Sequence, residues 1–215
     1  ALHRRRALGL KPFTVMSCDN LPSNGKKLHA ILVKLAGLRS TEFADFIETD
    51  VACPSTMIDR IVPQTTEKDA QDAGRALGVE DLSPVMTDPF TQWVIEDHFP
   101  LGRPPFEGAQ VQMVEDVMPY ELMKLRLLNA SHQGLAYFGR LSNYTYVHEV
   151  MQDPLITKLL IRYMDEEATP TLLPVPGVDL AKYKSQLIDV FCNHFNKHAV
   201  VSCCIIQSND LRNSF

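Results

Sequence analysis

One long apolar run, EDVMPYELMKLRLLNASHQGLAYFGRL, does most to limit what this chain can fold into; it covers about 27 residues from Glu115 to Leu141. The run is rich in Leu, Met and Ala, which favour helix, and its only proline, Pro119, stands at the first turn, where a helix tolerates it. Apolar residues would lie on nearly every side of this helix, which is typical of a buried helix. The run therefore predicts a long helix inside a helical domain.

Polar side chains interrupt this predicted helix. With about 100° of rotation per residue, Glu121, Lys124, Asn129 and His132 fall within an arc of roughly 140° on one side. Burying a lysine, an amide and an imidazole costs several kcal/mol unless each is paired. Two explanations are open from periodicity alone: Lys124 pairs with Glu121 while Asn129 caps a neighbouring helix, or these side chains form a chemical site.

The first third of the chain has the pattern of an α/β unit, and the rest is mostly helical. In the first part we predict the end of a basic helix at 2–8, a strand at 13–16, a loop at 17–20, a helix at 23–38 capped by Ser23 or Asn24, a short helix at 41–47 and an extended segment at 48–63 interrupted by Pro54. In the second part we predict helices at 66–78, 90–99, 115–141, 144–153, 156–172 and 180–195, with a loop at 102–108.

Composition excludes several classes of protein. The net charge is −5, and no basic run is longer than Arg4-Arg5-Arg6, so a nucleic-acid surface is not expected. The sequence has no stretch of eighteen apolar residues and no signal peptide, so we expect no membrane span and a cytoplasmic protein. The partner that we expect is a small molecule; the oligomeric state is left open.

Cysteine and histidine spacing does not predict a metal site. The five cysteines include no C-x-x-C pair, which argues against a disulfide framework or a zinc ribbon. Cys192, His194, His198 and Cys203 imitate a zinc spacing only loosely. Trp93 is expected to be a core or interface residue rather than a ligand.

Four blocks of sequence, in this order, carry a resemblance to a known family. They are SCDN at 17–20, PSTMIDRIVP at 54–63, FTQWVIEDHFPLGRPPFE at 90–107 and MKLRLLNASHQGLAYFG at 123–139. Together they resemble the polyol-specific long-chain dehydrogenases, of the mannitol 2-dehydrogenase and fructuronate reductase type. The resemblance extends over roughly residues 1–193, and the K-x4-N-x2-H spacing on one helix is its most specific motif.

The resemblance implies a fold class: mainly α, with a helical C-terminal dehydrogenase domain preceded by a remnant of an α/β Rossmann domain. On this basis residues 1–50 are the truncated end of the NAD-binding domain, 51–193 a truncated helical catalytic domain, and 194–215 a divergent tail. The chain starts at Ala1 and contains no G-x-G-x-x-G. We therefore expect a fragment whose cofactor, NAD or NADP, is bound largely by residues outside it, with no metal.

The resemblance also implies catalytic roles. Hydride transfer from a secondary alcohol needs a base for the hydroxyl proton and donors for the developing alkoxide. Lys124 corresponds to the family's general base, Asn20 and Asn129 to the donors on either side of the reacting oxygen, and His132 to a residue that orients substrate hydroxyls. A lysine on a desolvated face near a positively charged ring can act as a base, because both effects disfavour the ammonium form.

Two carboxylates correspond to further family residues near the active centre. Asp59 matches an acidic residue beside the substrate, and Glu121 matches a carboxylate that relays protons to solvent. Each also has a structural explanation: Asp59 could pair with Arg60 or Arg103, and Glu121 could be an ordinary i,i+3 partner of Lys124.

The resemblance breaks in the tail. The family's substrate-binding arginine and lysine fall on Ser202 and Asp210 of this chain. The sequence therefore predicts a dehydrogenase fragment that transfers hydride between NAD(P) and a sugar alcohol such as mannitol, with fructose as the ketose product. The alternatives are a hexuronate reductase and a noncatalytic helical interaction module or inactive remnant.

Overall fold

The computed structural model describes all residues except 61, 63–64, 88–89, 195–198 and 201–215. The described chain divides into two compact units, which we treat separately: unit 1 contains residues 1–59 and 91–121, and unit 2 contains residues 60–90 and 122–215. Helices predominate, so the predicted mainly α class is confirmed. Among the described residues, no helix combines the length and the apolar composition that crossing a bilayer requires.

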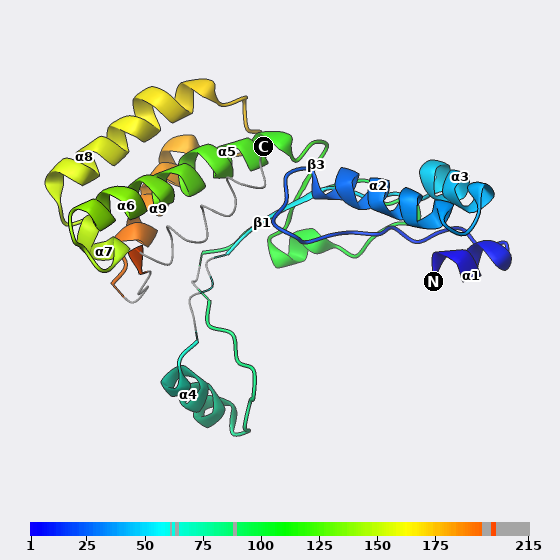
Figure 1. Ribbon diagram of the computed structural model, residues 1–215, viewed down its shortest axis with the longest axis horizontal. Helices are drawn as coiled ribbons and strands as arrows, with labels where there is room; N and C mark the ends of the chain where they lie inside the picture. The colour runs from blue at the N-terminus through cyan, green and yellow to red at the C-terminus, as the bar shows by residue number, and fades with distance from the viewer. Residues whose placement is uncertain (61, 63–64, 88–89, 195–198, 201–215) are drawn as a thin grey trace. The chain divides into compact units, whose positions relative to one another are not determined.

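Unit 1 joins three helices to a small sheet. Its elements are α1 (Leu2–Ala7), α2 (Asn24–Gly37), α3 (Thr41–Asp50), β1 (Thr56–Asp59), β2 (Gln92–Glu96), the 3-10 turn η1 (Phe106–Ala109), β3 (Gln112–Val114) and the start of α5 (Met118–Met123). Helices α2 and α3 lie side by side (Figure 1) and bury Ala36, Phe43 and Ile47 between them. The helices predicted at 2–8, 23–38 and 41–47 are confirmed, although α3 continues to Asp50.

The sheet of unit 1 corrects one prediction. Strand β2 pairs antiparallel with β1, with Thr56 opposite Ile95, and parallel with β3. The helix predicted at 90–99 is therefore wrong. A short apolar run such as QWVIE fits a buried strand as well as a buried helix. Here the segment is a strand because it forms backbone hydrogen bonds with β1 on one edge and β3 on the other. Val94 and Ile95 are fully buried, at 0% exposure.

Residues 13–16 do not form the predicted strand. The Val15 N–H donates a hydrogen bond to the Ala52 carbonyl oxygen at 3.0 Å. This bond does not continue into a β-ladder, and residues 13–16 are not assigned to a strand. The loop predicted at 102–108 also proves partly helical, because η1 begins at Phe106.

Unit 2 is helical in its described part. Its elements are α4 (Glu67–Leu77), the π-helical segment η2 (Lys124–Asn129), α6 (Ala130–Leu141), α7 (Val147–Val150), α8 (Pro154–Arg162), a second π segment η3 (Tyr163–Ala168), the 3-10 turn η4 (Thr169–Thr171) and α9 (Leu180–Cys192). Asp153 and Asp179 cap α8 and α9 by accepting backbone N–H bonds. The helices predicted at 66–78, 115–141, 156–172 and 180–195 are confirmed, with ends that differ by a few residues; residue 195 lies outside the described residues. Of the helix predicted at 144–153, only Val147–Val150 is helical.

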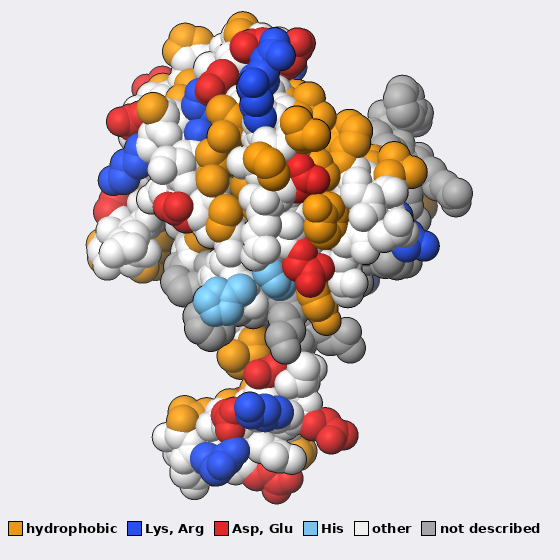
Figure 2. Space-filling model, turned by 90° about the vertical axis from the view of Figure 1, so that its left-hand side faces the viewer, with side chains coloured by type: hydrophobic (Ala, Val, Ile, Leu, Met, Phe, Trp, Pro, Cys, Tyr) orange, Lys and Arg blue, Asp and Glu red, His pale blue; other side chains and the backbone are white. Residues whose placement is uncertain are grey.

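The packing of unit 2 surrounds α6, which contacts both α7 and α8. Leu127, Leu135 and Leu187 are buried in this core. Leu141 and Leu155 remain exposed, and Figure 2 shows hydrophobic side chains gathered on the face of the helices turned to the viewer. The predicted divergent tail, 194–215, lies outside the described residues apart from 194, 199 and 200.

Candidate active site

Lys124, the predicted base, and Asn129, one predicted donor, are the first and last residues of a π-helical segment. The sequence predicted an ordinary α-helix here. Within η2 the Ala130 N–H donates to the Leu125 carbonyl oxygen, five residues back. In an ordinary α-helix, residues five apart point roughly 140° away from each other, since each residue adds about 100°. An i→i+5 pattern instead stacks residues five apart. The π segment therefore brings Lys124 and Asn129 towards a common face.

A neighbouring helix supports this π segment from the side. The Tyr163 hydroxyl donates to the Arg126 carbonyl oxygen at 2.9 Å, and the Arg126 guanidinium donates to the Thr171 carbonyl oxygen. Both partners belong to the stretch η3–η4, within unit 2. The unusual helical register is thus held by tertiary contacts as well as by its own backbone bonds.

The side chains of this segment are partly withdrawn from solvent. Lys124 is only 8% exposed, and His132 is half-buried. The His132 ring stacks on Phe191 of α9, with 5.4 Å between ring centroids and 29° between planes. Packing against an aromatic ring restricts the imidazole to few orientations, which suits a group that orients a substrate.

The other three predicted residues lie in unit 1. Asn20 is exposed in the turn that follows the extended segment, and Asp59 is buried, at 5% exposure, as the last residue of β1. Arg103, one of the cations considered as a partner of Asp59, binds Asp97 and Glu107 instead. The alternative in which Asp59 pairs with Arg60 stays open.

Glu121 forms a hydrogen bond with Ser23, which follows the turn that carries Asn20. Its two carboxylate oxygens accept the Ser23 N–H at 3.0 and 3.2 Å. Burial, the largest effect, raises the pKa of the Glu121 carboxyl, and the bond from Ser23 partly opposes this. The nearby carboxylates of Glu96 and Asp116 raise the pKa further. A carboxyl with a raised pKa can take up and release protons closer to neutral pH.

Asn24, which the sequence suggests only as a possible helix cap, has a different role in the structure. Ser23 occupies the N-cap position of α2 in a left-handed conformation, with φ of 50°, and its side chain makes no capping bond. The Asn24 amide is instead buried, at 2% exposure, and bonds Ser17, Asp19 and Thr56. Thr56 lies 32 positions further along the chain, so no pattern along the sequence indicated this partner.

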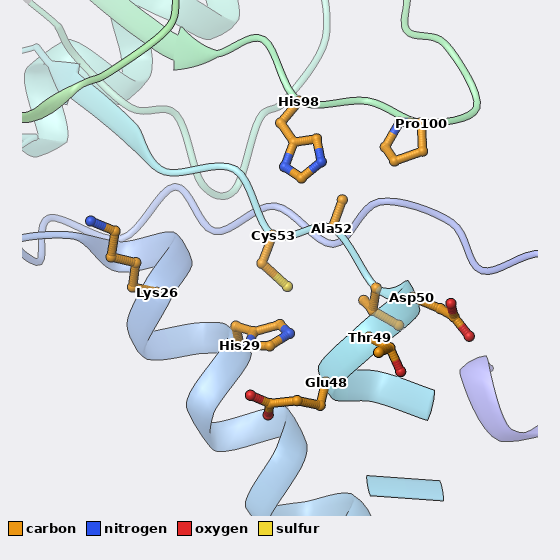
Figure 3. Close-up of a pocket in the computed structure, with 10 residues that line it drawn as sticks. Lys26, His29, Glu48, Thr49, Asp50, Ala52, Cys53, His98 and Pro100 are labelled. Carbon is orange, nitrogen blue, oxygen red and sulfur yellow. The ribbon is translucent and has the colours of Figure 1, made fainter. Parts of the chain in front are cut away.

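A cavity of about 390 Å³ in unit 1 is not the predicted site. Figure 3 shows the Cys53, His29 and His98 side chains pointing into it, with Lys26 at its rim. Burial raises the pKa of the Cys53 thiol to about 11, so the thiol stays protonated and is a poor nucleophile at neutral pH. None of the six predicted site residues lines this cavity.

A second cavity, of about 260 Å³, lies between α6 and α8 in unit 2. Its lining is mostly apolar, and the buried Ser131 hydroxyl has no hydrogen-bond partner in the part of the chain that the structure describes. A polyol, with a hydroxyl on each carbon, does not match such a lining. Elsewhere in the described residues, no group of three or more His, Cys, Asp or Glu side chains could hold a metal ion; His198 and Cys203 lie outside those residues.

Comparison with protein families gives a direct match along the chain. The family model for the mannitol dehydrogenase Rossmann domain matches residues 1–108, and the model for the mannitol dehydrogenase C-terminal domain matches residues 116–215. The chain therefore belongs to the mannitol dehydrogenase family. The resemblance inferred from the four sequence blocks is confirmed.

Individual relatives agree with this assignment. Mannitol 2-dehydrogenase of Aspergillus fumigatus is 50% identical over 195 residues, which are 89% of this chain and 39% of that protein. Mannitol dehydrogenase 2 of Saccharomyces cerevisiae is 45% identical over 212 residues, which are 98% of this chain and 42% of that protein. This chain thus spans about two fifths of the length of these curated relatives.

Two solved structures are similar in fold. A ternary complex of Pseudomonas fluorescens mannitol 2-dehydrogenase with NAD and D-mannitol matches with a TM-score of 0.81 and 45% identity, covering 94% of this chain and 41% of that one. D-sorbitol dehydrogenase in substrate-free form matches with a TM-score of 0.89 and 38% identity, covering 94% and 42%.

Proposed function

We propose that this chain carries the proton-transfer helix of an NAD-dependent polyol dehydrogenase, which oxidises a secondary alcohol of a sugar alcohol such as mannitol to a ketose, here fructose. Membership of the mannitol dehydrogenase family supports the proposal, as does the similarity to a structure that contains NAD and D-mannitol. When bound, NAD accepts the hydride. The chain has no glycine-rich dinucleotide turn, so its own residues are proposed to serve the proton and the substrate rather than the pyrophosphate.

Lys124 is proposed as the general base. The observation that carries this role is the π segment, which turns a buried lysine and Asn129 towards one face. The Lys124 Nζ takes the hydroxyl proton as the alcohol is oxidised and returns it in the reverse reaction. A neutral amide on the same face can donate a hydrogen bond to the oxygen as charge develops on it.

The remaining residues complete the proposal. Asn20 is the second donor to the reacting oxygen, and His132, held by Phe191, orients the substrate hydroxyls. Asp59 is a substrate-side acid, and Glu121, with its raised pKa, passes the proton from Lys124 towards solvent. The domain boundaries at residues 50 and 193 and the loss of substrate-binding cations at Ser202 and Asp210 stay predictions; the last two positions lie outside the described residues.

A chimeric enzyme tests this function. The 195 matched residues of the Aspergillus fumigatus enzyme are replaced by their counterparts from this chain. NAD reduction is measured with mannitol and sorbitol, and NADH oxidation is measured with fructuronate. The proposal expects the highest kcat/KM with mannitol. Preference for sorbitol or fructuronate would change the assigned substrate, and no turnover with any of them would favour a noncatalytic module.

Substitution of the base tests the mechanism. Lys124→Ala in the chimera should lower kcat by about two to four decades, the contribution of a lost acid–base group, with little change in NAD affinity. Lys158→Ala, an exposed lysine on α8, is the matched control and should leave kcat unchanged. A near-normal kcat for Lys124→Ala would exclude Lys124 as the base.

A further inference from the structure

The Asn24 side chain bridges three segments of unit 1. Its Nδ2 group lies 3.2 Å from the Ser17 carbonyl oxygen, 3.0 Å from that of Asp19, 3.1 Å from that of Thr56 and 3.0 Å from the Thr56 hydroxyl. Its Oδ1 atom accepts the Thr56 N–H at 2.9 Å. The amide thus pairs with both backbone groups of Thr56, as a peptide group of a neighbouring strand would.

This hydrogen-bonding pattern requires an amide of this length. A carboxylate offers acceptors only and would face three carbonyl oxygens, whereas a hydroxyl has a single donor. Because the group is 2% exposed, a donor or acceptor left unpaired here is not compensated by water. The bonding capacity of Asn24 is therefore fully used in holding two neighbouring segments together.

The turn that carries Asn20 depends on these bonds for its position. The segment from Ser17 to Asn20 lies outside any strand ladder or helix. The Thr56 hydroxyl donates to the Ser17 carbonyl oxygen at 2.7 Å, which adds a second link to β1. On the other side of the turn, Glu121 holds the Ser23 N–H. Side chains, rather than repeating backbone bonds, set the place of the turn.

We infer that Asn24 is a positioning residue of the proposed active site: its buried amide fastens the Ser17–Asn20 turn to β1 and thereby places the Asn20 side chain. The inference rests on the proposed role of Asn20. A displacement of about 1 Å in a catalytic group can lower the rate about a hundredfold, so Asn24→Ala is expected to lower kcat by about 10- to 100-fold.

The first test uses the 215-residue chain without any assay of activity. Hydrogen–deuterium exchange is followed for the amides of residues 17–23 in wild type, in Asn24→Ala and in Val94→Ala. The second variant removes buried side-chain volume from β2 and involves none of the Asn24 hydrogen bonds. Faster exchange in these residues is expected for Asn24→Ala and not for Val94→Ala. Equal exchange in the two variants would overturn the inference.

The second test is a double-mutant cycle in the chimeric enzyme, with Asn20→Ala and Asn24→Ala alone and together. If Asn24 acts through Asn20, the double variant should have about the kcat of Asn20→Ala alone, with KM for NAD unchanged. Additive losses, or a loss of thermal stability without a loss of kcat, would overturn the inference. A normal kcat for Asn20→Ala would instead refute the role of Asn20 in the proposed function, while the exchange experiment would still decide whether Asn24 holds the turn.

Discussion

Replacement of Gly25 tests how closely the start of α2 packs against the backbone of residues 53–55. A Cβ atom added to this residue would lie 2.4 Å from the Cys53 carbonyl oxygen and 2.6 Å from backbone atoms of Pro54 and Ser55. All three are backbone atoms, so no flexible side chain can move aside. An ordinary contact begins at 3.4 Å, so the start of α2 would have to shift by about 1 Å. Gly25→Ala should therefore destabilise the unit.

The magnitude follows from two effects of that shift. Overpacking typically costs about 1 to 3 kcal/mol. The same displacement would lengthen the 2.9 Å bond from the Thr56 N–H to Asn24 beyond hydrogen-bonding range, and a buried unpaired group costs about 1 to 3 kcal/mol. Because alanine has a higher helix propensity than glycine, the substitution also stabilises the helix by at most about 1 kcal/mol. We expect a net loss of about 1 to 5 kcal/mol in the free energy of unfolding.

The assay is urea unfolding followed by tryptophan fluorescence. The only tryptophan of the chain, Trp93, lies in β2 and so reports on unit 1. Gly25→Ala should lower the urea midpoint by about 0.5 to 2.5 M, given a typical slope of about 2 kcal/mol per molar urea. Gly37→Ala is the matched control: it lies in the same helix, its added Cβ would meet only Ala44 at 3.9 Å, and it should stabilise slightly. A midpoint for Gly25→Ala at or above wild type would refute this packing argument.

Two further predictions concern acid stability and cofactor binding. Hydrogen bonds from Arg103 lower the pKa of Asp97 and of Glu107 below their ordinary values of 3.8 and 4.5, so the stabilisation is complete above those values and is lost as the pH falls through the lowered ones. Arg103→Leu should therefore reduce stability at pH 6, and the difference from wild type should shrink as the pH is lowered from 5 to 2, as measured by urea midpoints; a constant difference would contradict this. The 215-residue chain alone, without a glycine-rich turn, should show no micromolar affinity for NADH in calorimetric titration, and tight binding would show that it holds a dinucleotide site of its own.

Local signals in the sequence determined most of the helices. Apolar spacing at 24–37 and 180–192, together with the capping aspartates before α8 and α9, needs only neighbours within a turn or two of helix. The motif that contains Lys124, Asn129 and His132 could likewise be recognised from the sequence, because its polar residues interrupt an apolar helical pattern. These features are local, so a single sequence suffices to find them.

Tertiary structure decided the features that depend on distant partners. Gln92–Glu96 became a strand because β1 and β3 pair with its two edges, whereas residues 13–16 lacked such a ladder. The π register at Lys124–Asn129 is supported by Tyr163, more than thirty positions further along the chain. Asn24, which the sequence presents as a plausible helix cap, instead bonds Thr56 on another segment. Hydrogen-bond partners of this kind are chosen by proximity in the folded chain, and no pattern along the sequence specifies them.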